Sequence, residues 1–143
     1  MYYIGIDLGT SAVKLLLMDE TGGIANIVSR EYPVSFPRPG WSEQAPADWW
    51  AAVCDGIPEL LAGFDAAQVK GIGAGGQMHG LVVLDKDDNV IRPCILWNDG
   101  RTQKQVDYLN EVIGKDILSR YTANIAFAGF TAPKLLWLRD NEP

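Results

Sequence analysis

The first third of the chain alternates between apolar segments and short polar breaks. Residues 2–8, 12–19 and about 24–34 carry the apolar and β-branched pattern that is typical of strands. The break at 9–11 reads Gly-Thr-Ser, and the break at 19–23 has the composition of a hairpin turn. Three consecutive strands are therefore predicted, followed by a loop rich in proline and glycine.

A helix and a fourth strand come next. Residues 46–62 place apolar side chains at helical spacing. Pro46 suits the first turn, whereas Pro58 is expected to kink or end the helix because proline removes one backbone hydrogen bond. Residues 69–74 then predict a strand that runs into Gly75-Gly76.

The second half of the chain mixes short strands with helices. Residues 81–84 and 90–95 predict two short strands around a polar turn. Residues 101–113 predict a helix that Gly114 ends. A last helix is expected to begin after Thr131, with a proline in its first turn.

This order of elements indicates an α/β fold of the ribonuclease H-like type, with a mixed sheet and flanking helices. Three strands, a helix and a fourth strand occur in that order, and the first strand carries an acid. Further strands and helices normally complete this layout. Residues 1–143 are therefore expected to be an incomplete first domain, the N-terminal portion of a longer protein.

Charge and composition argue against several classes of partner. The formal net charge is −6 and no dense cluster of Lys and Arg is present, so nucleic acid and anionic membranes are poor candidates. No basic leader precedes an apolar run, and no run approaches the roughly 18 residues of a membrane span. A cytoplasmic protein is expected, with Cys54 and Cys94 as reduced thiols.

Asp7 is the acid inside the first apolar strand. We expect it to be buried, which is costly unless the carboxylate is paired, hydrogen-bonded or set against a metal. The adjacent Gly9-Thr10-Ser11 turn offers flexible backbone and hydroxyl donors for phosphate. The functional interpretation is a metal-linked acid beside a phosphate-binding turn, and the alternative is an acid that caps its own turn. Lys14 either faces the phosphates or is simply exposed.

A second candidate is the glycine-rich segment 71–80, which holds the only histidine of the chain. Three of its glycines fit the spacing GxGxxG, but they lie within or just after a strand and no helix follows, so a dinucleotide site is not expected. Glycines at a strand end do allow a ligand to approach the backbone. We expect His79, between Met78 and Gly80, to face a cleft and contact polyol hydroxyls. The alternative is a structural histidine.

A third candidate places an indole, an amide, a carboxylate and a guanidinium close together, in Trp97, Asn98, Asp99 and Arg101. Sugar sites use these groups. A compatible alternative is a helix start capped by Asn98 or Asp99 over a core Trp97. The tryptophans within 41–50 are expected to pack rather than to bind a ligand. The chain has no GxxxxGK[ST] motif and only one histidine, which excludes a P-loop and a His-rich zinc site.

These segments, in this order, resemble the N-terminal domain of the FGGY carbohydrate kinases, which belong to the actin, hexokinase and Hsp70-type ATPase superfamily. Residues 5–11 are similar to the first phosphate motif, which alone identifies only the superfamily. Residues 75–80, 97–101 and 129–135 resemble the xylulokinase branch more specifically. The resemblance spans the whole chain.

The resemblance implies phosphorylation of D-xylulose to D-xylulose 5-phosphate, with ATP and Mg²⁺. It implies that Asp7 is the catalytic and metal-side residue of this segment. The other implied contacts are Gly9, Thr10, Ser11 and Lys14 to the phosphates, and Met78, His79, Trp97, Asn98 and Asp99 to the sugar. In the family, the general base and the adenine-binding domain come later in the chain. The isolated segment is therefore expected to be inactive.

Two alternatives stay open. One keeps the fold and changes the substrate to ribulose, gluconate, glycerol or another polyol, although the segment Gln77-Met78-His79-Gly80 argues against it. The other is a non-catalytic fragment or binding module. In either case, apolar surface left exposed by an incomplete domain predicts association, for example as a homodimer.

Overall fold

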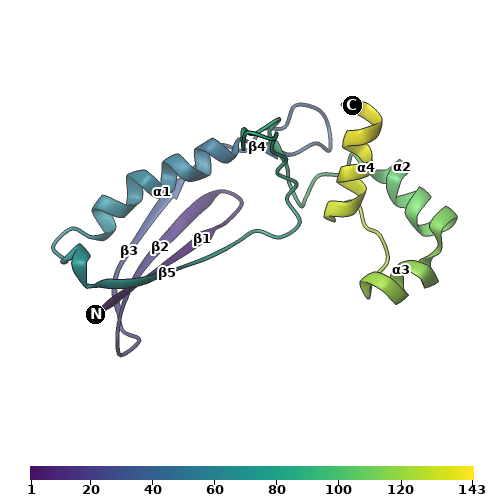
Figure 1. The fold of residues 1–143 in the computed structure, drawn as a ribbon. Helices are drawn as coiled ribbons and strands as arrows, with labels where there is room; N and C mark the ends of the chain where they lie inside the picture. Colours follow the sequence, from purple (N-terminus) through teal and green to yellow (C-terminus); the bar gives the residue numbers. More distant parts are fainter. The chain divides into compact units, whose positions relative to one another are not determined.

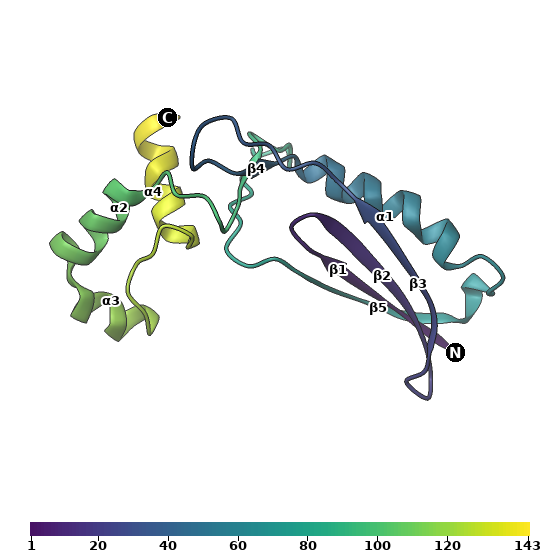
Figure 2. The same cartoon turned by 180° about the vertical axis from the view of Figure 1, so that it is seen from behind.

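The computed structural model describes all residues, 1–143. The chain forms two compact units. Unit 1 comprises residues 1–34 and 45–77, and unit 2 comprises residues 35–44 and 78–143. Figures 1 and 2 show the elements of both units from opposite sides.

Unit 1 is a mixed four-stranded sheet with one helix along one face (Figure 1). Its elements are β1 (Tyr2–Leu8), β2 (Ala12–Asp19), β3 (Ile24–Glu31), α1 (Pro46–Leu60), the 3₁₀ turn η1 (Ala66–Gln68) and β5 (Val69–Gly76). The strands are ordered β3-β2-β1-β5, and β5 is parallel to β1 while the other neighbours are antiparallel. The prediction of a mixed α/β fold is confirmed.

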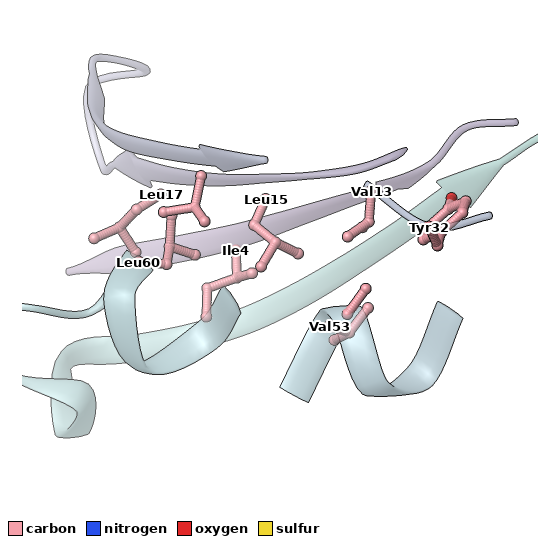
Figure 3. Close-up of a cluster of buried hydrophobic side chains, with 9 residues drawn as sticks. Ile4, Val13, Leu15, Leu17, Tyr32, Val53 and Leu60 are labelled. Atoms are coloured by element: carbon pink, nitrogen blue, oxygen red, sulfur yellow. The ribbon is translucent and has the colours of Figure 1, made fainter. Parts of the chain in front are cut away.

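The core of unit 1 lies between α1 and one face of the sheet. Alternate strand residues point to that face and interdigitate with the buried stripe of the helix. Figure 3 shows the cluster, which includes Ile4, Val13, Leu15, Leu17, Val53 and Leu60. Leu15 is completely buried, whereas its neighbour Leu16 points to the other face and is only partly covered. The helix therefore covers one side of the sheet and leaves the other side open.

Unit 2 contains very short strands and a group of helices (Figure 2). Its elements are β4 (Glu43–Gln44), β6 (Cys94–Ile95), α2 (Gln103–Asp107), the π-helix η2 (Tyr108–Gly114), α3 (Lys115–Thr122) and α4 (Thr131–Asn141). Strands β4 and β6 pair antiparallel, and single bridges join Leu81 to Ile95 and Leu84 to Val90. No helix in either unit combines the length and the apolar character that crossing a bilayer requires.

The strands of unit 1 match the predictions closely. Strands at 2–8 and 12–19 are confirmed, and the third strand ends at Glu31 rather than continuing to residue 34. Helix α1 ends two residues early, at Leu60. Pro58 was expected to kink or end this helix but lies inside it, near the C-terminal end, and the helix continues for two residues beyond it.

Unit 2 departs further from the predictions. The predicted strands at 81–84 and 90–95 are reduced to single bridges and the two-residue strand β6. The helix predicted at 101–113 begins at Gln103 and widens into the π-helix, which ends at Gly114 with φ +100°. Helix α3 was not predicted. The last helix is confirmed, beginning at Thr131 itself.

The two faces of β2 can be tested by truncating adjacent leucines. Leu15→Ala should lower the free energy of unfolding by about 2–5 kcal/mol, because it removes a completely buried side chain and leaves a cavity. Leu16→Ala on the opposite face should cost less than half as much. Urea unfolding followed by circular dichroism measures both, and equal losses would contradict the assignment of the two faces.

Candidate functional site

Asp7 lies on the open face of the unit 1 sheet. Ile4, Ile6 and Leu8 of β1 pack in or against the core, so Asp7 points to the opposite side. Its side chain is exposed, which corrects the expectation of a buried carboxylate. The expectation was wrong because the apolar neighbours of Asp7 indicate that one face of the strand is covered, and Asp7 is on the other.

A shallow groove of about 500 Å³ runs over the sheet beside Asp7. In the strand register, Asp7 is paired with Lys14 of β2 and with Gly75 of β5. The Lys14 side chain is also exposed, and no ion pair joins it to Asp7. A Cβ added at Gly73 or Gly75 would meet no atom within 4 Å. The missing side chains of β5 therefore keep the space beside the carboxylate open.

The turn Gly9-Thr10-Ser11 is held from two sides. Within the turn, the amide of Gly9 donates to the carbonyl of Ala12 at 3.0 Å. The hydroxyl of Tyr32 donates to the carbonyl of Gly9, and the amide of Tyr32 donates to the carbonyl of Ser11 at 3.2 Å. The turn is thus fixed to the residue that follows β3.

Gln77 fixes the same turn from the end of β5. Its amide donates to the carbonyl of Leu8 at 2.8 Å, and its side-chain oxygen accepts from the hydroxyl of Thr10 at 3.2 Å. The Ser11 side chain stays exposed. Of the residues predicted for the phosphate side, Ser11 is thus exposed on a hydrogen-bonded turn, and Asp7 and Lys14 are exposed on the paired strands β1 and β2.

Tyr32 is a site residue that the sequence analysis did not find. It is buried at one end of the core cluster, beyond Val13 (Figure 3). Burial raises the pKa of its phenol, and the nearby negative charge of Asp7 raises it further. Tyr32 therefore remains a neutral hydrogen-bond donor under the turn. In the sequence it is only an aromatic residue after a strand, and nothing separates it from a core residue.

In unit 2, His79 has an unusual backbone and a stacked ring. Its φ of +59° is in the left-handed region, which non-glycine residues rarely adopt. The exposed imidazole stacks on Phe130, with ring centroids 4.2 Å apart and planes 22° from parallel. Met78 beside it is 59% exposed. Met78 and His79, two of the residues predicted for the sugar side, are therefore accessible.

The carbonyl of His79 is bonded to a buried lysine. Lys134 has no exposed surface, and its Nζ donates to the carbonyls of His79 at 2.7 Å and Gly129 at 2.8 Å. Burial lowers the pKa of this ammonium to about 8. Cys94 and Asp99 raise this pKa by smaller amounts, and Arg101, the smallest effect, lowers it. A buried cation thus supports the segment that carries His79.

The next sugar-side candidates separate into exposed and buried groups. Trp97 is 43% exposed and Asn98 is also exposed. Trp97 is therefore not a core residue, and the cap position of α2 is Thr102, which makes no side-chain cap bond. The alternative of a capped helix start over a core Trp97 is wrong. The indole and the amide are both open to a ligand.

The Asp99 carboxylate is hydrogen-bonded to groups of the protein itself. Asp99 is 1% exposed, and its carboxylate accepts from the amide of Ser42 at 2.7 Å and from the amide of Arg101 at 2.9 Å. The Arg101 guanidinium adds two more bonds to it, at 2.9 and 2.7 Å. This geometry favours a bracing role for Asp99 rather than direct contact with a sugar.

Arg101 connects the segment to two tryptophans and a second acid. Its fully buried guanidinium lies 3.7 Å from the ring centroid of Trp41 and 4.9 Å from that of Trp137. It also forms an ion pair of 2.8 Å with Glu43. The expectation that the tryptophans within 41–50 pack is confirmed for Trp41 and wrong for Trp50, which is 70% exposed.

Close packing joins the segments around 97–102 and 126–130. The buried hydroxyl of Thr102 donates to the carbonyl of Ala128 at 3.0 Å. A Cβ added at Gly129 would lie 2.4 Å from the carbonyl oxygen of Trp97. No side chain fits at Gly129, so the contact between the two segments depends on glycine.

This contact can be tested with matched glycine variants. Gly129→Ala should lower the free energy of unfolding by about 1–3 kcal/mol, because the added methyl group meets backbone that cannot rotate away. Gly100→Ala is the control, since its Cβ would make only an ordinary contact of 3.6 Å with the Gly40 carbonyl. Urea unfolding measures both, and equal stability of the two variants would contradict the packing described.

The candidate residues fall into two groups, one in each unit. Asp7, the turn and Lys14 share one end of the unit 1 sheet, while His79 and Trp97 of unit 2 both contact the segment 129–134. No group of three or more His, Cys, Asp or Glu residues could hold a metal ion by itself.

Comparisons with known proteins agree on one family. Residues 2–143 match the N-terminal domain of the FGGY family of carbohydrate kinases. The chain is 46% identical to the xylulose kinase of Lactococcus lactis, over 99% of this chain and 28% of that protein.

Solved structures give the same result. The structure of a xyloylose kinase from Brucella ovis matches with a TM-score of 0.93 and 46% identity, over 99% of this chain and 30% of that one. A gluconate kinase from Lactobacillus acidophilus matches with a TM-score of 0.91 and 30% identity, over 99% of this chain and 28% of that one. The chain thus spans less than a third of the length of these relatives. The match to these structures confirms the ribonuclease H-like fold. The chain belongs to the FGGY family of carbohydrate kinases.

Proposed function

We propose that this chain is the N-terminal part of the first domain of a kinase that transfers phosphate from ATP to D-xylulose. The observation that carries the proposal is its 46% identity to a xylulose kinase over 99% of its length. The exposed groups of both units support it, because they match the needs of a phosphate site and a polyol site. We place the protein in the cytoplasm, where ATP is available.

The phosphate side fits a magnesium nucleotide. Mg²⁺ is usually bound through one or two carboxylates, with substrate phosphates and water as the other ligands. Asp7 supplies one exposed carboxylate without an ion-pair partner, and the glycines of β5 leave room beside it. When bound, the cation would neutralise charge on the transferring phosphate.

The protein groups around Asp7 would hold and orient the phosphates. Ser11 offers an exposed hydroxyl and Lys14 an exposed ammonium. Gly9 and Thr10 shape the turn, which Tyr32 and Gln77 hold in place. Positioning and charge stabilisation account for most of the catalysis in phosphoryl transfer, so a rigid turn is directly useful.

On the sugar side, His79, Trp97 and Asn98 present accessible polar and flat apolar groups. The imidazole nitrogens and the Asn98 amide can exchange hydrogen bonds with hydroxyl groups, and Met78 adds an exposed apolar side chain. Asp99 supports the site indirectly, because its buried carboxylate accepts two hydrogen bonds from the Arg101 guanidinium. We therefore assign sugar contact to Met78, His79, Trp97 and Asn98, and a supporting role to Asp99.

Gluconate is the alternative substrate that a specific observation favours. The fold of the chain matches a gluconate kinase nearly as well as it matches the Brucella ovis kinase, with TM-scores of 0.91 and 0.93. The identity supports D-xylulose over gluconate, since it is 30% to the gluconate kinase and 46% to the Brucella ovis kinase. Gluconate also carries a carboxylate, and no lysine or arginine is among the exposed sugar-side residues assigned above.

Sugar binding by the chain can be measured through tryptophan fluorescence. Millimolar D-xylulose should change the emission of the wild-type chain, because Trp97 is exposed beside the proposed sugar groups. Trp97→Phe should abolish the change, and Trp50→Phe should keep it, since Trp50 is 70% exposed on α1 of unit 1. Gluconate in the same titration tests the alternative. A flat response to every sugar would favour a non-catalytic module.

Catalysis can be tested in a complete enzyme. A chimera in which this chain replaces the matching 28% of the Lactococcus lactis xylulose kinase should release ADP in the presence of D-xylulose. Asp7→Asn in the chimera should reduce kcat by about 10²- to 10³-fold, because one stabilising charge at the phosphates is lost.

The matched control for Asp7→Asn is Asp55→Asn, at an exposed carboxylate on α1. It should leave kcat unchanged. The 143-residue chain alone should show no turnover. An Asp7→Asn chimera as active as the Asp55→Asn chimera would remove Asp7 from the proposed phosphate site.

A further inference from the structure

The residues that contact His79 come from one short segment, the start of α4. The carbonyl of His79 accepts from Lys134 Nζ at 2.7 Å and from the hydroxyl of Thr131 at 3.3 Å. Its ring stacks on Phe130, the residue that precedes the helix. Backbone and side chain of His79 are therefore fixed by residues 130–134.

The backbone contacts matter because His79 is in a conformation that it does not favour. A φ of +59° is unfavourable for a residue with a Cβ and persists only where the surroundings impose it. Two donors on one carbonyl, one of them a buried cation, provide that constraint. Charge-assisted bonds of this kind are among the stronger hydrogen bonds in proteins.

The ring contact leaves the chemistry of the imidazole available. Stacking uses a face of the ring, and no hydrogen bond in the structure uses its nitrogens. Phe130 is itself supported by Phe127, with ring centroids 5.1 Å apart. The ring is thus oriented while both nitrogens remain free for hydroxyl groups.

We propose that residues 130–134, which lead into and form the start of α4, are a clamp that positions His79 for sugar recognition, with Lys134 and Phe130 as positioning residues. This inference rests on the proposed function, which makes His79 a sugar-side group. Lys134 has a second effect in the clamp, because it also bonds the carbonyl of Gly129, the residue packed against Trp97. One ammonium thereby links the supports of both sugar-side segments.

The single histidine of the chain makes the clamp directly observable. Proton NMR of the 143-residue chain gives one set of imidazole resonances. In the wild type these should be displaced upfield by the ring current of Phe130. Phe130→Leu should return them toward the position of a free histidine, while Phe127→Leu, which removes a neighbouring ring that does not stack on His79, should largely preserve the displacement.

Sugar titration in the same samples tests the link to recognition. D-xylulose should move the His79 resonances. Lys134→Met should raise the dissociation constant about tenfold, the effect expected from losing the charge-assisted hydrogen bond to the His79 carbonyl. Lys104→Met, which removes an exposed charge from α2, should leave it unchanged. Thr131→Val removes the weaker contact and gives a smaller change in affinity.

The outcomes separate the clamp from the proposed function. Resonances that Phe130→Leu leaves in place, or folded Lys134→Met and Thr131→Val variants that bind D-xylulose as the wild type does, overturn the clamp. If the sugar moves no His79 resonance in the wild type, the sugar role of His79 fails, and the proposed substrate site fails with it. The comparison of Phe130→Leu with Phe127→Leu needs no sugar and still decides whether α4 sets the ring.

Discussion

The interaction on which unit 2 depends is the burial of the Arg101 guanidinium. Taking a cation out of water is costly unless opposite charges and hydrogen bonds replace the solvent. Asp99 provides the bidentate partner, Glu43 provides a second negative charge, and the rings of Trp41 and Trp137 lie against the guanidinium. Because these partners come from three separate stretches of chain, the buried charge determines how those stretches assemble.

Helix α4 connects the buried Arg101 guanidinium to the segment that bears the exposed His79. Trp137 contacts the guanidinium from one part of the helix, and Lys134 supports the carbonyl of His79 one turn earlier. Two buried cations are therefore held by the same helix, and each supports an exposed segment. In unit 1 the corresponding support is neutral, since the Tyr32 hydroxyl and the Gln77 side chain hold the phosphate turn through hydrogen bonds.

The sequence predicted unit 1 well because alternation in a strand is a local property. The bounds of β1 and β2 follow from it directly, and so does the position of the Gly9-Thr10-Ser11 turn. The expectation of a buried Asp7 was wrong because it treated the apolar strand as a whole. The alternation of Ile4, Ile6 and Leu8 with Asp7 indicates one covered face and one open face. In unit 2, the seven-residue π-helix cannot be told from α-helix by spacing. The positions of Lys134 in unit 2 and of Tyr32 in unit 1 depend on partners that are distant in sequence.

The two cysteines of the chain have opposite environments. Cys54 is exposed on α1, whereas Cys94 is buried in β6, and burial raises the pKa of its thiol to about 11. Because alkylating reagents react with the accessible thiolate, the folded chain offers them one reactive sulfur. The second sulfur becomes reactive only when unit 2 opens. The rate of alkylation at Cys94 therefore measures how often the packing around this sulfur, which lies near Gly80 and Lys134, opens in the folded chain.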